Sequence, residues 1–273
     1  MNISTYRKKI LENISRHDSM LVAFSGGVDS SLLAVLAREV LGEKSRCVLL
    51  DSPLVPREAI DEALLIAKKC NLDVEVLPVS VMEDQNFLMN PKDRCAWCKR
   101  NSAIVLNKKA KELGFSCIAD GINKSDTHEH RPGLAASTEA GIVHPFLEES
   151  ISKQQIRELA KNEGLSFWNK PSAACLASRI PYGDKITVEA LDMIENAEAF
   201  LHKSGLRQVR IRAHGKLARI EVPEKDMQDV MNIRSSIIEN LRKVGFTYVS
   251  LDLDGYRTGS MDEAISNEQK NNV

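Results

Sequence analysis

The chain has 273 residues, of which 43% are hydrophobic and 27% charged, and its formal net charge is −1. These values indicate a globular protein with a sizeable core, arranged as one large domain or two modest ones. They exclude a general affinity for nucleic acid or an acidic membrane surface, and no apolar run is long enough to span a bilayer. The N-terminal segment lacks the apolar region of a signal peptide, so we expect a cytoplasmic protein whose six cysteines are thiols, metal ligands or catalysts.

The first part of the chain alternates short β-rich stretches with helical patterns. This alternation predicts an α/β domain over residues 1–185, with a Rossmann-like parallel sheet and crossover helices. A helix beginning after Ser152, a residue type that caps helices, completes it. The expected strands are 20–24, 46–50, 73–79 and 115–119, and the expected helices are 31–41, 57–70, 97–113 and 152–163.

The pattern changes at PYGDKIT, residues 181–187. The remaining residues predict a second, smaller α+β domain over 186–273, with helices packed on an antiparallel sheet. Its expected elements are a helix at 188–204, strands at 207–212 and 217–222, a helix at 224–243 and a strand at 246–252.

The sequence SGGVDS, residues 25–30, joins the first strand to the first helix. Gly26 and Gly27 allow the backbone to approach an anion closely, and Ser25 and Ser30 add hydroxyl donors. The helix N-terminus that comes next favours negative charge. The segment is neither a Walker A loop, since the lysine is missing, nor GxGxxG. A purely structural turn is the alternative, but the whole hexapeptide between strand and helix favours a phosphate site.

This hexapeptide resembles the PP-loop of the ATP pyrophosphatase superfamily, whose members cleave ATP between the α- and β-phosphates and transiently adenylate a substrate. The resemblance implies ATP and Mg²⁺ as cofactors and a catalytic role for Asp29. Ligands of open α/β sheets bind at the carboxyl ends of strands. The expected ATP-binding residues are therefore those of the loop and of two strand ends: Ser25, Gly26, Gly27, Asp29, Ser30, Asp51, Asp120 and Gly121. A solvated loop carboxylate is the alternative for Asp51.

Three further segments narrow the family: NPKDRCAWCKR at 90–100, DGINKSDTHEHRPG at 120–133 and NKPSAACLASRIPYG at 169–183. Together with the PP-loop they resemble the LarE family of ATP-dependent sulfur transferases of nickel-pincer nucleotide biosynthesis. The resemblance covers residues 15–260. It implies adenylation of a carboxylate of a pyridinium biscarboxylate mononucleotide and its conversion to a thiocarboxylate. It also implies a sulfide source as partner and a homo-oligomer, with a hexamer as one candidate, built through the second domain.

The cysteines separate into two groups. Cys47, Cys70 and Cys117 lie in core patterns and are expected to be structural. Cys95 and Cys98 begin a helix, whose N-terminus favours thiolate. Family members with one cysteine before SRxPYG give up its sulfur, whereas members with three resemble iron–sulfur proteins. We therefore expect a [4Fe–4S] cluster that carries the transferred sulfur. Its ligands would be Cys95, Cys98 and the catalytic Cys175. The alternatives are sacrificial transfer from Cys175, a zinc site and a redox dithiol.

The strand RQVRIRA alternates polar and apolar residues, so Arg210 and Arg212 share one face. The next strand adds Arg219 and Glu221 to that face. We predict a clamp for the phosphate or carboxylates of the acceptor, because arginine binds both in a bidentate manner. Arg131 and Arg179 would add positive charge for the substrate. A solvated sheet face is the alternative.

Three other functions compete with this interpretation. A cluster-dependent PP-loop tRNA thiolase would be expected to show a basic second domain, but residues 187–260 contain equal numbers of basic and acidic residues. An ammonia-using ligase, such as an NAD or GMP synthetase, needs no CxxC. A nucleotide-binding module would bind ATP without releasing pyrophosphate.

Overall fold

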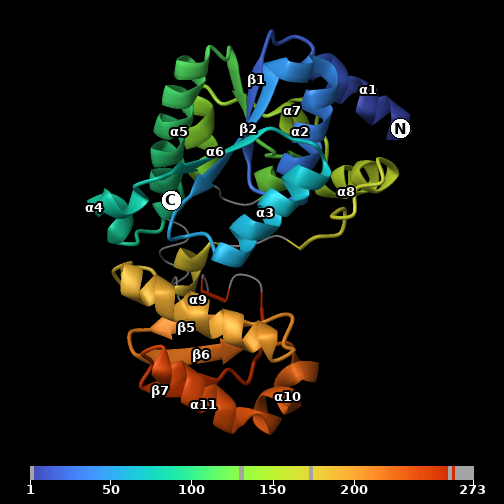
Figure 1. Cartoon of the computed structure of the whole chain (residues 1–273). Helices are drawn as coiled ribbons and strands as arrows, with labels where there is room; N and C mark the ends of the chain where they lie inside the picture. The colour runs from blue at the N-terminus through green and yellow to red at the C-terminus, as the bar shows by residue number, and fades with distance from the viewer. Residues whose placement is uncertain (1–2, 129–131, 172–174, 258–259, 262–273) are drawn as a thin grey trace. The chain divides into compact units, whose positions relative to one another are not determined.

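The structure, a computed structural model, describes residues 3–128, 132–171, 175–257 and 260–261 (Figure 1). The chain forms two compact units. The first comprises Met1–Asp84 and Asp93–Ala173, and the second comprises Gln85–Lys92 and Ala174–Val273. Residues 175–185, which were expected in the first domain, and residues 85–92 belong to the second unit.

The first unit is built on a four-stranded sheet in the order β3-β2-β1-β4, in which every neighbouring pair is parallel. This confirms the predicted Rossmann-like α/β fold. The order places β1 at the centre, so the turn after β1 lies between the turns after its neighbours. The strands are β1 (Met20–Phe24), β2 (Ser45–Asp51), β3 (Val74–Pro78) and β4 (Cys117–Ala119).

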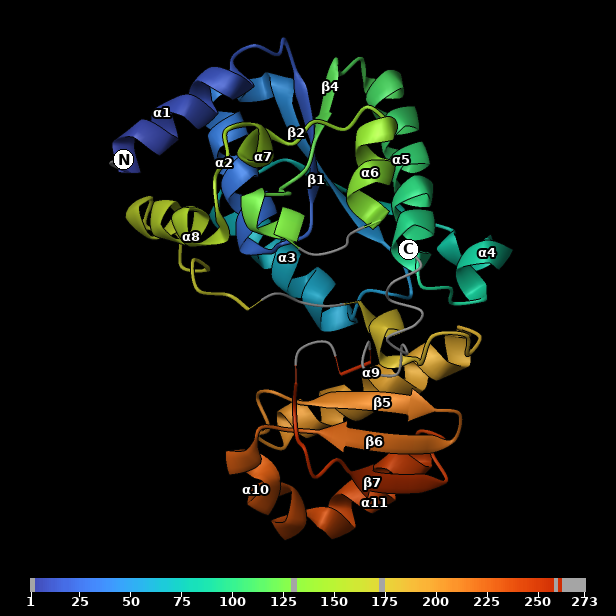
Figure 2. The same cartoon turned by 180° about the vertical axis from the view of Figure 1, so that it is seen from behind.

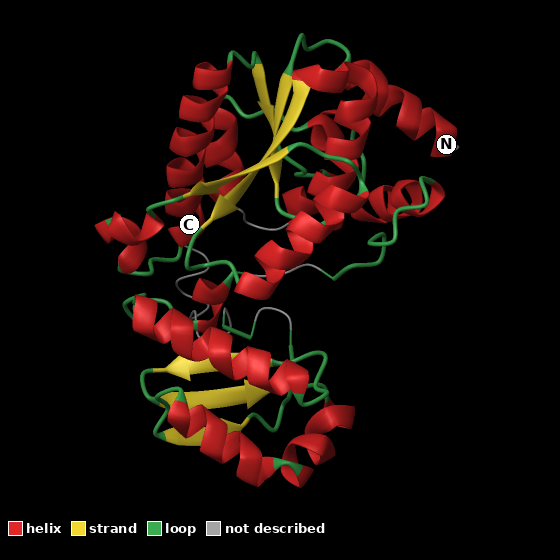
Figure 3. Cartoon of the chain, viewed as in Figure 1, coloured by secondary structure: helices red, strands yellow, loops and turns green. Residues whose placement is uncertain are grey.

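Helices cover both faces of this sheet (Figure 3). The larger apolar cluster joins Val22 and Leu49 of the sheet to one helical layer, and the smaller cluster joins Leu21 and Val48 to the other. Both faces of β1 and β2 are therefore buried, as parallel strands require. The first layer contains α1 (Ile3–Ile14), α2 (Val28–Leu41), α3 (Arg57–Lys69), α7 (Pro145–Glu148) and α8 (Lys153–Asn162), and the second contains α5 (Arg94–Leu113), against which α6 (Pro132–Glu139) packs.

The second unit has a three-stranded sheet in the order β5-β6-β7, with α9 (Val188–Lys203) and α11 (Arg234–Lys243) on one face (Figures 1 and 2). β5 and β6 are antiparallel as predicted, but β6 and β7 are parallel, so the prediction of an antiparallel sheet was wrong for that pair. The segment between them crosses over the sheet and returns the chain in the same direction. The elements are α4 (Gln85–Leu88), α9 (Val188–Lys203), β5 (Arg210–His214), β6 (Leu217–Glu221), α10 (Met227–Asn232), α11 (Arg234–Lys243) and β7 (Tyr248–Leu251).

The expected helix over 224–243 is interrupted. A 3₁₀ turn at Glu224–Asp226 precedes α10, and Ile233 separates α10 from α11. The break lets α11 present Ile237 and Leu241, both buried, to the sheet. In the part of the chain that the structure describes, no helix combines the length and the apolar character needed to cross a membrane.

Residues 85–92 are bound to the second unit through Asn90, which is fully buried. The side-chain amide of Asn90 donates hydrogen bonds to the carbonyls of Ile180 (3.2 Å) and Pro181 (2.7 Å). The backbone carbonyl of Asn90 accepts a hydrogen bond from the Gly183 N–H (3.0 Å). The segment that leads into α5 and its CxxC is thus fixed to the PYG loop that comes after Cys175.

Candidate functional site

The turn after β1 is held close to α3. Gly26 has φ +67°, a conformation that favours glycine, and a Cβ atom there would lie 2.6 Å from the Cα and Cβ atoms of Ala63. No side chain fits in that space. The turn therefore stays thin, and its backbone N–H groups can approach a bound anion.

The two serines of SGGVDS brace the turn. The Ser30 hydroxyl lies 3.0 Å from the Ser25 hydroxyl and accepts a hydrogen bond from the Ser25 N–H (3.1 Å). Gly27 is the N-cap of α2, and no side chain caps that helix. An uncapped helix N-terminus at the end of a central strand is well suited to bind phosphate.

The end of β4 lies directly against this turn. A Cβ atom on Gly121 would be 2.7 Å from the Ser30 nitrogen and 2.9 Å from the Asp29 Cβ. Gly121 is thus brought together with Asp29 and Ser30, as expected for two loops at one edge of a parallel sheet.

Asp29 is the charged residue of the turn, and its surroundings are unusual. One carboxylate oxygen, Oδ2, is bonded to Lys153, whereas Oδ1 is buried and has no hydrogen-bond partner among the described residues. Burial raises the pKa of Asp29, and the nearby charge of Asp126 adds to that effect, while Lys153 opposes it. The unsatisfied oxygen is a position where a metal cation or a donor from a ligand would be stabilised.

The sequence analysis missed two lysines at this site. Lys153 is the first residue of α8, whose N-terminus is fixed by a capping box between Ser152 and Gln155. Lys170 donates a hydrogen bond to the Gly26 carbonyl (3.1 Å) and pairs with Glu62 (2.9 Å). Both lie more than 120 residues after the turn, so the pattern of the turn itself could not identify them, although Lys170 belongs to the segment 169–183 quoted above.

The two other predicted strand-end carboxylates already have protein partners. Asp51 forms an ion pair with Arg57 (2.6 Å). Asp120 is 7% exposed and contacts His144 and Lys99. Burial raises the pKa of Asp120, but the hydrogen bond from His144 and the charge of Lys99 outweigh it, so that pKa lies below its usual range.

The six cysteines differ in exposure. Cys47 and Cys117 are buried, and burial raises the pKa values of their thiols to about 12 and about 11, which makes them poor nucleophiles. Cys95 is exposed and Cys98 is half-buried. Both lie near the start of α5 and, being three residues apart, they share one side of the helix. Cys175 is exposed immediately before the 3₁₀ turn Leu176–Arg179.

Among the described residues, no three metal-ligating side chains gather into one group. Two of the three expected cluster ligands belong to the first unit and Cys175 belongs to the second. Their chemistry nevertheless suits an iron–sulfur cluster, because all three thiols reach solvent, unlike Cys47 and Cys117.

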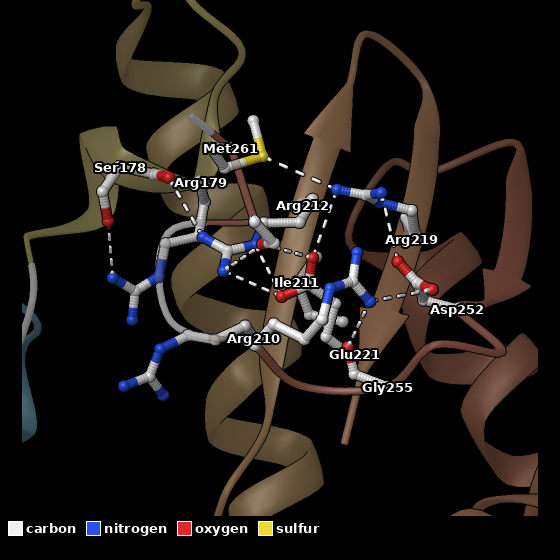
Figure 4. Close-up of polar contacts among 12 residues, drawn as sticks. Ser178, Arg179, Arg210, Ile211, Arg212, Arg219, Glu221, Asp252, Gly255 and Met261 are labelled. Atoms are coloured by element: carbon white, nitrogen blue, oxygen red, sulfur yellow. Dashed lines mark hydrogen bonds and ion pairs between the residues drawn. The ribbon is translucent and has the colours of Figure 1, made fainter. Parts of the chain in front are cut away.

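In the second unit, the predicted polar face of the sheet is an ion-pair network (Figure 4). Glu221 is fully buried and accepts hydrogen bonds from Arg212 Nε (2.9 Å) and Nη2 (2.8 Å). Arg219 bridges Glu221 (3.2 Å) and Asp252 (3.1 Å). Arg212 is therefore neutralised by a buried partner, which makes it a structural element of this face.

Arg179 is also neutralised. Its guanidinium forms two 3.1 Å hydrogen bonds with Glu198, and its Nη1 donates to the Cys175 carbonyl (3.0 Å). Arg179 thus fixes the Cys175 carbonyl.

Arg210 is different from its neighbours. It donates to the Val209 carbonyl (2.7 Å) and stacks over Tyr256 (5.7 Å), but no carboxylate pairs with it among the described residues. Burial and the charge of Arg179 lower its pKa. A partly buried guanidinium without a counter-ion favours an anionic ligand. Arg131, also predicted to contact substrate, lies outside the described residues.

The chain is similar to several known proteins. Residues 3–94 match the family model described as NAD synthase. The chain is 36% identical to an uncharacterized protein of Synechocystis sp. over 262 residues, which cover 94% of this chain and 98% of the relative. It is 32% identical to pyridinium-3,5-bisthiocarboxylic acid mononucleotide synthase of Lactiplantibacillus plantarum, covering 98% of this chain and 97% of that protein. It is 28% identical to a glutamine-hydrolyzing GMP synthase of Allorhizobium ampelinum, covering 75% of this chain and 45% of that protein.

The raised pKa of Asp29 predicts a pH-dependent stability effect. The folded state binds the Asp29 proton more tightly than the unfolded state, so ionisation of Asp29 destabilises the fold as pH rises above about 4. Asp29→Asn should therefore raise the melting temperature at pH 7, and the gain should vanish below about pH 4. Asp61→Asn, at an exposed position on α3, is the control. A lower melting temperature for Asp29→Asn at pH 7 would mean that the Lys153 contact outweighs the burial of Asp29.

Proposed function

The chain belongs to the family of pyridinium-3,5-bisthiocarboxylic acid mononucleotide synthase, and we propose that it is an adenylating, ATP-dependent sulfur transferase. Its substrate would be a pyridinium biscarboxylate mononucleotide, one carboxylate of which becomes a thiocarboxylate. The observation that carries this proposal is the identity over almost the whole length of both chains, combined with an uncapped helix N-terminus at the PP-loop.

ATP would bind with its pyrophosphate portion at the N-terminus of α2. There the backbone of the turn and the Ser25 and Ser30 hydroxyls offer donors. Lys153 and Lys170, which pair with Asp29 and Glu62 in the protein, would add positive charge beside the phosphates. The unsatisfied Oδ1 atom of Asp29 suits Mg²⁺, which when bound would neutralise charge on the phosphates. Asp51, Asp120 and Gly121 stay proposed ATP contacts, with the Asp120 carboxylate already bonded within the protein.

Adenylation solves a chemical problem of the acceptor. A carboxylate resists nucleophiles because it is anionic and its oxygen is a poor leaving group. After adenylation, AMP can leave, so attack by sulfur becomes feasible at neutral pH. The positive charges of Lys153 and Lys170 would stabilise the departing pyrophosphate.

For the acceptor, we assign the anion contact to Arg210. Arg210 forms no ion pair among the described residues. Glu198, which acts on its charge, is already paired with Arg179, and Glu221 is paired with Arg212. Arg212, two residues after Arg210 in β5, would stabilise the sheet face that carries Arg210. Arg179 would fix the Cys175 carbonyl. The exposed apolar side chains of Tyr248 and Leu253 suit the proposed homo-oligomer contact of this unit.

Cys95, Cys98 and Cys175 would hold the proposed [4Fe–4S] cluster, which when bound would leave one iron open to carry the sulfur for transfer. The chain itself contributes two anchored segments. The CxxC comes after the segment fixed by Asn90, and the Cys175 carbonyl is fixed by Arg179. Sacrificial transfer from Cys175 is the competing mechanism, and it would need neither Cys95 nor Cys98.

The products of ATP turnover test the superfamily chemistry. We expect AMP and pyrophosphate in the presence of the acceptor, because the PP-loop binds the leaving pyrophosphate. Asp29→Ala should abolish their formation without unfolding the protein, as judged by circular dichroism. Chromatography of the nucleotides distinguishes AMP from ADP, and ADP as the main product would contradict adenylation.

A pair of arginine variants tests the acceptor contact. Arg210→Gln should weaken binding of the acceptor about tenfold, the loss expected for a hydrogen bond to a charged group, and leave ATP affinity and stability nearly unchanged. Arg212→Gln should instead destabilise the second unit by about 3 kcal/mol, because Glu221 is left buried without its main partner. Calorimetric titration and thermal unfolding measure the two effects. Equal loss of acceptor and ATP binding in Arg210→Gln would contradict the assignment.

Single cysteine replacements separate the cluster from the sacrificial mechanism. After anaerobic reconstitution, Cys95→Ala, Cys98→Ala and Cys175→Ala should each bind much less iron and acid-labile sulfide than the parent, whereas Cys70→Ala should match the parent. If Cys95→Ala and Cys98→Ala keep full iron or still form thiocarboxylate, the cluster proposal is wrong. Loss of one sulfur from Cys175 in the parent protein, seen by mass spectrometry, would favour sacrificial transfer.

A further inference from the structure

Two residues without a role in the function proposed above, His144 and Thr138, form a chain of hydrogen bonds that runs from the exposed Thr138 through the buried His144 to Asp120. His144 Nδ1 lies 2.7 Å from Asp120 Oδ1, and His144 Nε2 lies 3.0 Å from the Thr138 hydroxyl. The side chains of His144 and Asp120 are only 6% and 7% exposed. An imidazole with a partner on each nitrogen is held in one orientation.

The direction of the central hydrogen bond is set by the charge of Asp120. An ionised carboxylate only accepts hydrogen bonds, so His144 Nδ1 carries a proton and its N–H donates a hydrogen bond to Asp120. The same carboxylate accepts from the Ile122 N–H (3.1 Å) and lies 3.4 Å from Lys99 Nζ. Asp120 is thus fixed from α5, from its own loop and from the residue preceding α7.

This fixed carboxylate immediately precedes the contact between β4 and the PP-loop. Gly121 lies so close to Asp29 and Ser30 that a single added carbon would overlap them. Small rotations of the Asp120–Gly121 peptide would therefore move the first turn of α2, where the phosphates are proposed to bind.

We propose that His144 is a positioning residue for ATP: by donating to Asp120, it holds Gly121 against Asp29 and Ser30 and sets the geometry of the PP-loop. The effect on ATP rests on the proposed function, whereas the effect on the loop backbone does not.

The order hydroxyl, imidazole, carboxylate is also that of a hydrolase triad. Here the carboxylate end of the chain of hydrogen bonds adjoins the PP-loop, and the Thr138 hydroxyl lies 3.0 Å from the Leu134 carbonyl of its own helix. We therefore assign Thr138 to the orientation of His144 and not to nucleophilic attack.

The charged groups that face His144 give a second readout. They are Asp120, Lys99 beyond it, and Glu148 of α7, whose Oε1 accepts from the His144 backbone N–H at 3.3 Å. Without His144, Asp120 loses the partner that most lowers its pKa, and its burial then raises that pKa. The acid limb of the pH profile of pyrophosphate release should shift to higher pH.

Two substitutions of His144 separate its two hydrogen bonds. The amide nitrogen of Asn overlays Nδ1 and can still donate to Asp120, whereas that of Gln overlays Nε2 and cannot. His144→Gln should lower kcat/KM for pyrophosphate release about tenfold and shift the acid limb, while His144→Asn should stay within about threefold of the parent. Ile10→Ala, a buried packing variant on α1, should lower the melting temperature without changing kcat/KM or the pH profile.

Hydrogen exchange of the nucleotide-free protein tests the geometry independently of catalysis. His144→Gln should accelerate exchange of the amides of residues 25–31 and 121–122, and His144→Asn should not. If His144→Gln fails to fold, Thr138→Val should accelerate exchange of the same amides by a smaller factor. Equal behaviour of the Gln, Asn and parent proteins, or equal damage by Gln and Asn, would overturn the positioning role. A parent that releases no pyrophosphate but shows the expected exchange pattern would reject only the proposed function.

Discussion

Two contacts that tolerate no side chain determine the geometry of the candidate site. Gly26 lies against Ala63 of α3, and Gly121 lies against Asp29 and Ser30. Together they hold the turn after β1 between the neighbouring helix and the neighbouring strand end. Because the turn is fixed from both sides, the N-terminus of α2 is presented in one orientation, and the polar groups around it can be arranged for one ligand.

The positively charged side chains around the turn come from distant parts of the chain. A Walker loop carries its own lysine, whereas here Lys153 and Lys170 arrive from α8 and from the segment after it. The charge of Asp29 is costly to hold at this position, because burial raises its pKa and its Oδ1 atom has no partner among the described residues. Such a cost is common at functional sites, where binding of a ligand relieves it.

The sequence predicted the features that depend on local pattern. The four parallel strands, the capped start of α8 at Ser152 and the glycine-rich turn are all determined by residue types at short spacing. The direction of β7 could not be read from its own residues, since it depends on how residues 224–243 cross the sheet. Lys153 and Lys170 were missed for the same reason, because only the tertiary fold brings them to Asp29 and Gly26. Likewise, alternation placed Arg210 and Arg212 on one face, but only the structure distinguishes the paired Arg212 from Arg210.

In the proposed function, the first unit would activate the acceptor with ATP and the second would recognise its anionic groups. The most direct measurement is mass spectrometry of pyridinium-3,5-biscarboxylic acid mononucleotide after anaerobic incubation with the reconstituted protein, ATP, Mg²⁺ and isotopically labelled sulfide. The account predicts an acceptor in which labelled sulfur replaces one carboxylate oxygen, formed over several turnovers per chain. An unchanged acceptor, or an amide formed when ammonia is supplied, would contradict it.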